Sequence, residues 1–594
     1  MQKSKGLSLV ACLMMIGLIA SLISGCGGGG GGGGGGGVGE KPQYGGQLNM
    51  WLAADPTYFD DALGMHAYTT GPYQCLWGGN WSKGHAGGYG TAECDWYLRG
   101  ESDRYIDKAG MLAESWEIGS NYIIFHLRQG VHWQNISPVP KGRLVTADDV
   151  IYSWERQRTL STGYVKTTYP EMNAAMSISK IDDSTVRFDC PSQYMSTLIS
   201  IIDYVFIYPK DVIEMYGDMA AWDRAIGTGA FTIKEYVPSS YLDWQRNPTY
   251  WQTNPIGPGQ GDQLPYLSSV KTLIVADPAT ADSLFTTGQI DITTADFDRA
   301  QALLAVANEK GVKYNKFIDG TVKYVIFMRM DNPDKPYGDV RVRQALQLAI
   351  NNQQIVDQYF GGQAIYPYWP VYPCKEYDAA YLPLKNYPDE PVLGPESVSV
   401  KDLFGYDPDK AKQLLADAGY ADGFKAEIVF WDFYLLSDVL QMVKSMWSEI
   451  GVDLTLKGVS STEALTIQYF GSFNDMFFGG FSGDGTYFKG INYSGKGMWN
   501  ASRINDPVLN NYISQMLATW PDEDATCSIH RQMLPSLVEN CYVIQTAAHY
   551  TWVFWWPWLK NYSGEGAVGY YPGSSLGWIQ YVWIDQALKK SMGY

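Results

Sequence analysis

The stretch from Met111 to Arg158 constrains the fold of this chain more than any other, because its pattern predicts a pair of strands and then a capped helix. In the first half, Ile123, Phe125 and Leu127 recur at every second position, as in a strand with one well-buried face. Gly130 ends this pattern. A half-buried pair of strands is therefore expected here.

The second half of the stretch predicts a helix. Thr146 is a good N-cap residue, and Asp149 lies three residues on, where its carboxylate can reach back to the free N–H groups of the first turn. Val150, Ile151 and Trp154 then recur at helical spacing. One side of this helix is therefore expected to be buried.

Three segments of this stretch, LAESW, FHLRQGVHW and TADDVIYSWER, resemble the signature of the family-5 extracellular solute-binding proteins. These are the peptide-type receptors of bacterial ABC importers. Further segments resemble the same family in the same order, among them IGTGAFTIKEYVPSSYLDWQRNPTYW and YDPDKAKQLLADAGY. The resemblance implies an α/β fold, a two-lobed periplasmic-binding-protein-like clamp with an extra subdomain inserted in the first lobe. A ligand would be enclosed between the lobes by a hinge motion.

The resemblance also implies a domain organisation, and a chain of 594 residues is in any case too long for a single core. Two crossover segments, the first near Lys316 to Met330, would form the hinge. Lobe I is expected at residues 44–70, 195–316 and 547–594, its inserted subdomain at 71–194, and lobe II at 317–546.

The N-terminal segment has the pattern of a bacterial lipoprotein. Lys3 and Lys5 precede an apolar run that is too short to predict a transmembrane helix, and LISGC resembles a lipobox with Cys26 as the acylated residue. An unbroken glycine run, 27–37, then predicts a flexible tether. Residues 1–25 are expected to be a signal peptide and 26–43 the lipidated cysteine and tether. The alternative is an ordinary signal peptide with a chance cysteine.

The net charge and the lipoprotein pattern of the N-terminal segment limit the partners that the protein can have. The net charge of −18 argues against nucleic acid or an anionic bilayer as a direct partner. The expected partners are a small-molecule or peptide ligand, ABC permease subunits, and the membrane through the lipid anchor alone. We expect a monomer outside the cytoplasm, lipid-anchored to the periplasmic or cell-surface face of the cell membrane.

Cys12 leaves with the signal peptide and Cys26 is the lipidated residue, so six cysteines remain. They form no CxxC motif and have no histidine at ligand spacing, so neither a metal site nor a cofactor is expected. The favoured disulfide pairs Cys75 with Cys94, because it would close a glycine-rich loop, although the sequence does not fix the pairing.

The segment NDMFFGGFSGDGTYF, residues 474–488, carries the best candidates for ligand binding. In peptide-binding relatives the matching stretch carries a tryptophan and an aspartate that pairs with the peptide's α-amino group. Phe481 stands here for the tryptophan and Asp484 for the aspartate, next to Gly483, and such a charged hydrogen bond is worth about 1.5–3 kcal/mol. Phe478 stands where oligopeptide binders can present an arginine. The alternatives are a plain glycine-rich turn and an amine-free ligand such as an oligosaccharide.

Two further regions are candidates through the resemblance. The loop from Ala62 to Tyr68 resembles a segment that lines the cleft, so His66 and Tyr68 are ligand-binding candidates. The aromatic tail at 547–564 contains WPWLKNY, which resembles the strand that returns the chain to the first lobe. A sugar platform and a membrane-interface belt are the alternatives for these aromatics.

An enzyme is not expected. Neither GxSxG nor HExxH occurs, and Asp148 and Asp149 lie in the first turn of a predicted helix, where they favour its dipole. We therefore predict no catalytic residues. A carbohydrate-active surface lipoprotein is the enzyme-class alternative, and a sensory module built on the same clamp is a third interpretation.

Overall fold

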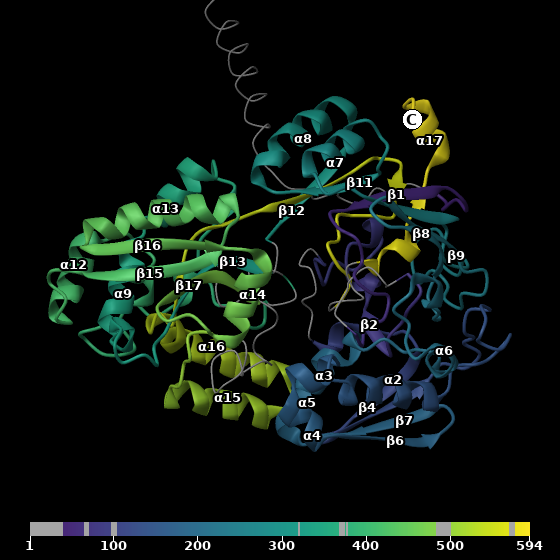
Figure 1. The fold of residues 1–594 in the computed structure, drawn as a ribbon, viewed down its shortest axis with the longest axis horizontal. Coiled ribbons are helices and arrows are strands. Elements are labelled where there is room, and N and C mark those ends of the chain that lie inside the picture. The colour runs from purple at the N-terminus through teal and green to yellow at the C-terminus, as the bar shows by residue number, and fades with distance from the viewer. Residues whose placement is uncertain are drawn as a thin grey trace, which may run out of the picture. The chain divides into compact units, whose positions relative to one another are not determined.

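The computed structural model of the protein describes residues 40–63, 71–96, 104–318, 321–367, 375, 378–482, 500–569 and 576–594. Residues 42–594 form one compact unit, in which two groups of sheets are joined by the strands β12 (Lys313–Phe317) and β20 (Thr551–Trp555) (Figure 1). We call the group that contains β1 (Gln47–Leu52) lobe I and the group that contains β13 (Thr321–Met328) lobe II. The predicted two-lobed α/β clamp is confirmed, and the domain limits given above stay predictions.

Lobe I is built on a four-stranded sheet. Leu48, Val270 and Trp244 are register partners across three of its strands, and all three side chains are buried. This row anchors the core of the lobe, because each residue lies on the same face of the sheet. In spatial order the strands are β1 (Gln47–Leu52), β10 (Ser269–Ile274), β9 (Tyr241–Arg246) and β8 (Phe231–Val237), with β1 parallel to β10 and the others antiparallel.

A second sheet of lobe I holds the hinge strands. β20 lies between β11 (Ile292–Ala295) and β12, antiparallel to both, and the helices α7 (Pro278–Thr286) and α8 (Phe297–Lys310) accompany it. The strand β20 of the aromatic tail therefore lies in one sheet with β11 and β12, and the assignment of 547–594 to lobe I stays a prediction. Trp552, Trp555 and Trp556 are buried there.

The stretch from Met111 to Arg158 folds as its pattern predicts. The strand β5 (Tyr122–Leu127) buries every second side chain. At the start of α2, the carboxylate of Asp149 accepts a hydrogen bond from the N–H of Thr146 (3.0 Å) and pairs with Arg143 (2.5 Å). The sheet has the order β4 (Ala113–Ile118), β5 (Tyr122–Leu127), β7 (Thr185–Asp189), β6 (Ser177–Asp182), with the helices α2 (Ala147–Thr159), α3 (Tyr164–Thr168), α4 (Pro170–Ala175) and α5 (Ser192–Ile201).

The favoured disulfide is wrong. Cys75 and Cys94 are both buried and form no disulfide with each other. The S–H group of Cys75 instead donates a hydrogen bond to the main-chain oxygen of Asp203 (3.2 Å), and burial raises the pKa of this thiol. A glycine-rich loop between two cysteines is therefore no guide to their separation in space.

Lobe II is built on a five-stranded mixed sheet whose helices begin as the sequence predicts. Asp339 caps α9 and Asp407 caps α12, each through a hydrogen bond from a first-turn N–H group. The strand order is β16 (Val452–Val459), β15 (Phe424–Trp431), β17 (Met476–Ser482), β13 (Thr321–Met328), β18 (Val543–Gln545), and the helices are α9 (Val340–Leu348), α12 (Pro408–Asp417), α13 (Tyr434–Glu449), α14 (Ser461–Phe470), α15 (Pro507–Thr519) and α16 (Glu523–Glu539).

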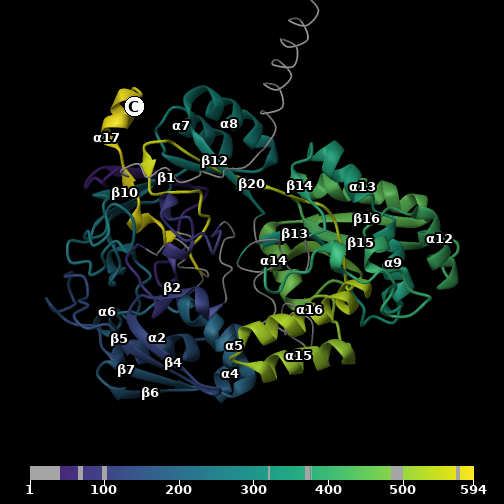
Figure 2. The same cartoon turned by 180° about the vertical axis from the view of Figure 1, so that it is seen from behind.

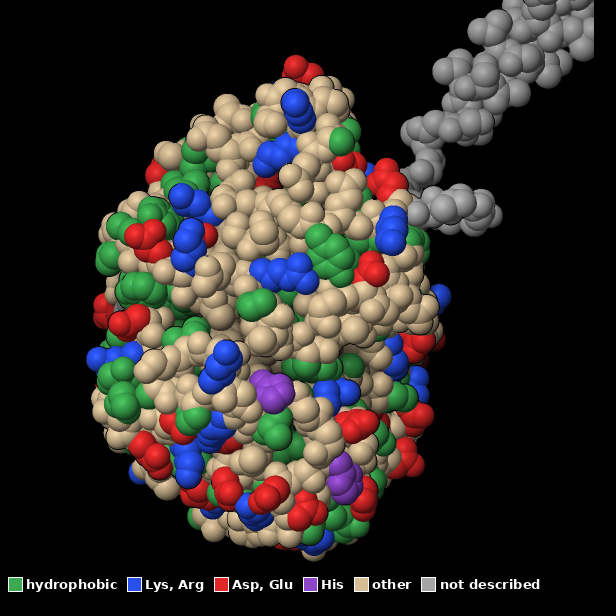
Figure 3. Space-filling model, turned by 90° about the vertical axis from the view of Figure 1, so that its right-hand side faces the viewer, with side chains coloured by type: hydrophobic (Ala, Val, Ile, Leu, Met, Phe, Trp, Pro, Cys, Tyr) green, Lys and Arg blue, Asp and Glu red, His purple; other side chains and the backbone are tan. Residues whose placement is uncertain are grey.

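Shorter elements complete the described residues. They are β2 (Trp77–Gly79), β3 (Lys108–Gly110), β14 (Ala364–Ile365), β19 (Ala548–His549), β21 (Leu559–Lys560), β22 (Trp583–Ile584), α6 (Lys210–Tyr216), α10 (Asn352–Gln354), α11 (Val400–Leu403) and α17 (Gln586–Ser591). Within the described ranges, none of the helices combines the length and the apolar character needed to cross a membrane. On the described part of the face in Figure 3, acidic and basic side chains are interspersed.

Candidate functional site

The predicted ligand-binding residues fall largely outside the described part of the chain. Gly483, Asp484, His66 and Tyr68 lie outside it, so their roles stay predictions. Phe478 lies in the middle of β17, where its side chain is fully buried and its ring contacts Tyr324 (centroids 6.3 Å apart).

Phe481 lies at the hinge end of lobe II. It pairs with Val322, and Ser482 pairs with Thr321, at the very start of β13. The segment 318–320 joins β13 to β12, so the end of β17 lies beside the point where the chain enters lobe II. The described part of the predicted segment, 474–482, therefore ends at the hinge side of lobe II.

A cavity of about 270 Å³ lies at the hinge edge of lobe I. Phe317, the last residue of β12, and Thr551, the first residue of β20, are register partners and both line it. The cavity thus borders the place where both crossover segments leave lobe I. Its lining consists of Met50, Trp51, Leu52, Ala53, Leu242, Trp244, Thr272, Ile292, Thr293, Thr294, Phe317, Thr551, Val553, Tyr562, Glu565, Gly566, Leu576 and Trp578.

The depth of this cavity follows from the burial of its lining. Ala53 and Thr294 are exposed and form its mouth. Trp244 and Trp578 are each only 2% exposed and form its floor. The cavity therefore runs from the surface at the hinge edge into the core of lobe I.

Most polar groups of the lining are already bonded within the protein. The indole N–H of Trp51 donates to the hydroxyl oxygen of Thr293 (3.0 Å), and the hydroxyl of Tyr562 donates to the main-chain oxygen of Glu565 (2.8 Å). The Oε2 atom of Glu565 accepts the N–H of Ser563 (2.7 Å), and burial raises the pKa of this carboxyl group. The walls consequently offer a ligand mainly apolar and aromatic surface.

The loop that carries His66 and Tyr68 begins at a rigid anchor. The carboxylate of Asp60 receives two hydrogen bonds from the guanidinium of Arg156 on α2 (3.0 and 2.7 Å). Asp61 accepts a hydrogen bond from Gln157 (3.2 Å), and burial, followed by the charge of Asp60, raises its pKa well above the usual range. The residues just before the loop are thus fixed to α2.

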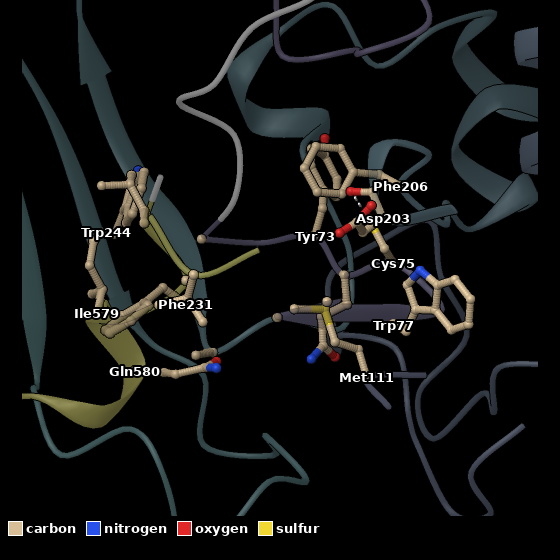
Figure 4. Close-up of a pocket in the computed structure, with 18 residues that line it drawn as sticks. Tyr73, Cys75, Trp77, Met111, Asp203, Phe206, Phe231, Trp244, Ile579 and Gln580 are labelled. Carbon is tan, nitrogen blue, oxygen red and sulfur yellow. Dashed lines mark hydrogen bonds between the residues drawn. The ribbon is translucent and has the colours of Figure 1, made fainter. Parts of the chain in front are cut away.

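A smaller cavity lies deeper in lobe I (Figure 4). Figure 4 shows Trp244 and Phe231 on one side of it and Tyr73 and Trp77 on the other. Its volume of about 50 Å³ has room for one or two water molecules, which each occupy about 30 Å³ in the liquid. It is therefore too small for a peptide or a sugar.

The lobes also touch at a second place, away from the hinge strands. There α15 packs against α5, as Figures 1 and 2 both show. Arg104 lies 3.5 Å from the carboxylate of Glu523 and 3.4 Å from that of Asp524, and the N–H of Tyr105 donates to Glu523 (3.0 Å). The ring of Tyr105 meets that of Trp520 edge-on. We call these five residues the α16 contact.

Glu523 is the titratable group of the α16 contact. Burial raises its pKa to about 7, although the charge of Arg104 and the N–H of Tyr105 act in the opposite direction. Burial therefore outweighs the ion pair at this carboxyl group. Among the described residues, no group of three or more His, Cys, Asp or Glu side chains is placed as for a metal ion.

The sequence pattern did not predict the residues that line this cavity. They come from β1, β9, β10, β11, β12, β20 and the segment 562–578, which are far apart along the chain. Only the aromatic tail gave a signal, and its tryptophans were expected in a return strand. Glu565 follows that strand in a glycine-rich segment that carries no motif.

The sequence and the fold of the chain are similar to those of known proteins. A family model described as "Bacterial extracellular solute-binding proteins, family 5 Middle" matches residues 109–498. The chain is 28% identical over 363 residues to "Heme-binding protein A" of Haemophilus influenzae, covering 57% of this chain and 60% of that protein. It is 25% identical over 368 residues to a "Dipeptide-binding protein" of Escherichia coli, covering 57% of this chain and 61% of that protein. The match thus spans about three fifths of the length of these relatives.

A solved structure resembles the chain over a longer range. The periplasmic binding protein DppA of Helicobacter pylori, in complex with the peptide STSA, superposes with a TM-score of 0.68 at 19% identity. The superposition covers 92% of this chain and 99% of that one. This likeness concerns the fold.

Proposed function

Because the chain belongs to the bacterial extracellular solute-binding proteins of family 5, we propose that it is an extracytoplasmic receptor that captures a small ligand between its lobes and delivers it to an ABC importer. The proposed ligand is an oligopeptide or dipeptide. One observation carries the proposal: the cavity of about 270 Å³ lies where both crossover segments meet lobe I, and β17 ends where the first of these segments enters lobe II.

Capture and delivery follow from the two-lobed fold. A ligand favours closure only when it binds the closed form better than the open one. A ligand that touches both lobes gains the full set of contacts only when the lobes are close together. The importer then distinguishes loaded from empty receptor by shape. No catalytic step is needed, and we assign none.

Asp484 is proposed to pair with the α-amino group of a peptide. Replacing Asp484 with Ala should weaken peptide binding tenfold or more, because a charged hydrogen bond is worth about 1.5–3 kcal/mol. The matched control is Asp453→Ala, an exposed carboxylate in lobe II. Calorimetry that gives equal affinities for the Asp484→Ala variant and the native protein would reject this role.

The ligand itself is best identified by mass spectrometry of the small molecules that co-purify with the protein. A peptide would support the proposal. An oligosaccharide is the second candidate, because the aromatic faces of Trp51 and Trp578 in the cavity can stack on sugar rings. Co-purified saccharide without peptide would favour that candidate.

Anchoring is proposed to depend on Cys26. Acyl chains on this cysteine would hold the protein at a membrane, since two or more chains anchor stably where one does not. Metabolic labelling with a fatty acid should mark the native protein and leave Cys26→Ser unlabelled. Equal labelling of both would place any lipid elsewhere. Uptake assays after deletion of the importer distinguish a transport receptor from a sensory module.

A further inference from the structure

The walls of the cavity beside the hinge are mainly apolar. Trp51, Trp244 and Trp578 contribute aromatic surface, and most of the remaining lining is aliphatic or threonine. The polar atoms of Trp51 and Tyr562 are used in hydrogen bonds within lobe I. Within the part of the chain that the structure describes, the buried indole N–H of Trp244 has no hydrogen-bond partner. A ligand group that enters therefore gains mainly by leaving water, with few hydrogen bonds to be made.

The volume of the cavity limits what can enter. Apolar cavities of about 150 Å³ are known to bind benzene, and this one measures about 270 Å³. Pockets for entire drug-sized ligands range from about 300 to 1,000 Å³. The cavity thus has room for one large side group, of the size of an indole, and the rest of the ligand must lie outside it.

The side chains that line the cavity also disfavour anionic ligand groups. Among the described residues that line the cavity there is neither a Lys, an Arg nor a His, so nothing there would neutralise a carboxylate or a phosphate. The one carboxyl group, that of Glu565, accepts the N–H of Ser563, and its raised pKa favours the uncharged form. An apolar group fits these walls better than an ionic one.

We propose that the cavity receives a bulky apolar side group of the captured ligand, aromatic or long aliphatic, while the polar part of the ligand lies between the lobes beside the end of β17. This inference rests on the proposed function, because it assigns the ligand class of the same site. A receptor of this kind prefers peptides that carry a large apolar residue over peptides built from small ones.

The test uses the full chain and tripeptides as probes. Tri-alanine is compared with peptides that carry one tryptophan, or one lysine, at each of the three positions. At least one tryptophan peptide should bind about 10- to 100-fold more tightly than tri-alanine, as expected from burying one large apolar side chain.

Two variants close the mouth of the cavity, Ala53→Trp and Thr294→Trp, on exposed positions that tolerate a larger side chain. Each should abolish the tryptophan preference. The control is Ala54→Trp, a neighbouring exposed position that does not line the cavity, which should retain it. Circular dichroism identifies any variant that fails to fold, in which case the other one decides.

The outcomes separate this inference from the proposed function. Equal affinity for tri-alanine and every tryptophan peptide would overturn the inference while leaving a peptide receptor. A preference for lysine would overturn it in favour of a cationic group facing Glu565. If no tripeptide binds, the proposal of a peptide ligand fails, and indole is used as the probe instead. Saturation-transfer NMR that detects indole on the native protein but not on Ala53→Trp would support the inference. The absence of indole binding to the native protein would overturn it.

Discussion

At the hinge the lobes are joined by main-chain strands, whereas at the α16 contact they meet through side chains and one main-chain N–H group, that of Tyr105. In the hinge sheet, β20 is hydrogen-bonded to β11 and β12 and carries the buried residues Trp552 and Val553. In the α16 contact, Arg104 and Tyr105 meet Glu523, whose pKa is raised to about 7. The hinge is therefore held by main-chain hydrogen bonds and buried apolar side chains, whereas the α16 contact contains ion pairs and a carboxyl group whose pKa is about 7.

This difference matches what a clamp requires. A hinge must persist while the lobes open, so its strands gain from burial and from a complete hydrogen-bond ladder. In the proposed clamp a contact away from the hinge must form and break as the lobes move, and one that depends on a partly compensated buried carboxyl group contributes little net stability. The four predictions below test the contrast, from the largest expected effect to the smallest.

Truncating the hinge strand should have the largest effect. Trp552 is 2% exposed, so Trp552→Ala is expected to lower the free energy of unfolding by about 3–5 kcal/mol, as large-to-small changes of buried aromatics do. Tyr314→Ala is the control, because it truncates an aromatic residue that is 48% exposed on the neighbouring strand. Urea denaturation that gives equal losses for the two variants would contradict the role of β20 as a buried hinge.

The α16 contact should weaken as the pH rises. The pKa of Glu523 is higher in the contact than its ordinary value of 4.5, so its contribution is fully present below about pH 4.5 and is lost as the pH rises through about 7. The total loss is at most about 3 kcal/mol, from 1.36 kcal/mol for each pH unit. Urea denaturation from pH 4.5 to 8 measures it. Because a glutamine side chain mimics the uncharged acid, Glu523→Gln should remove this part of the pH dependence, and an unchanged profile would exclude Glu523 as its source.

Removing the cation should move the titration without abolishing it. The charge of Arg104 lowers the pKa of Glu523, so Arg104→Met is expected to raise that pKa above 7 and to shift the loss of stability to higher pH. The pKa can be read from the carboxyl carbon of Glu523 by NMR. A downward shift would mean that Arg104 does not face this carboxylate.

The exposed partner of the same arginine should matter least. The side chain of Asp524 is 87% exposed, so Asp524→Asn is expected to change the free energy of unfolding by no more than about 1 kcal/mol, as is usual for exposed ion pairs. A loss as large as that at Glu523 would show that the α16 contact depends on net charge rather than on burial.

Local features of the sequence predicted the local structure well. Thr146 and Asp149 begin α2 as expected, and Asp407 begins α12, because a cap acts within one helical turn. The period-two pattern of β5 likewise became its buried face. Such signals need only the neighbouring residues, and they also carried the family resemblance on which the two-lobed architecture was predicted.

Contacts between distant segments were not predictable in the same way. Arg104 and Glu523 are separated by much of lobe I and most of lobe II along the chain, and neither belongs to a motif. Cys75 was expected to bond to Cys94, yet its thiol faces Asp203, because the fold rather than the loop length sets its neighbours. The cavity joins residues as far apart as Trp51 and Trp578, so its existence depends on the packing of whole sheets.

The central claim is that a ligand closes the two lobes, and small-angle X-ray scattering tests it most directly. The radius of gyration of the protein should be measured without ligand and at saturation with the molecule that co-purifies with it. The account predicts a smaller radius in the bound state, since the lobes approach one another around the hinge strands. Saturated binding with an unchanged radius of gyration would contradict it.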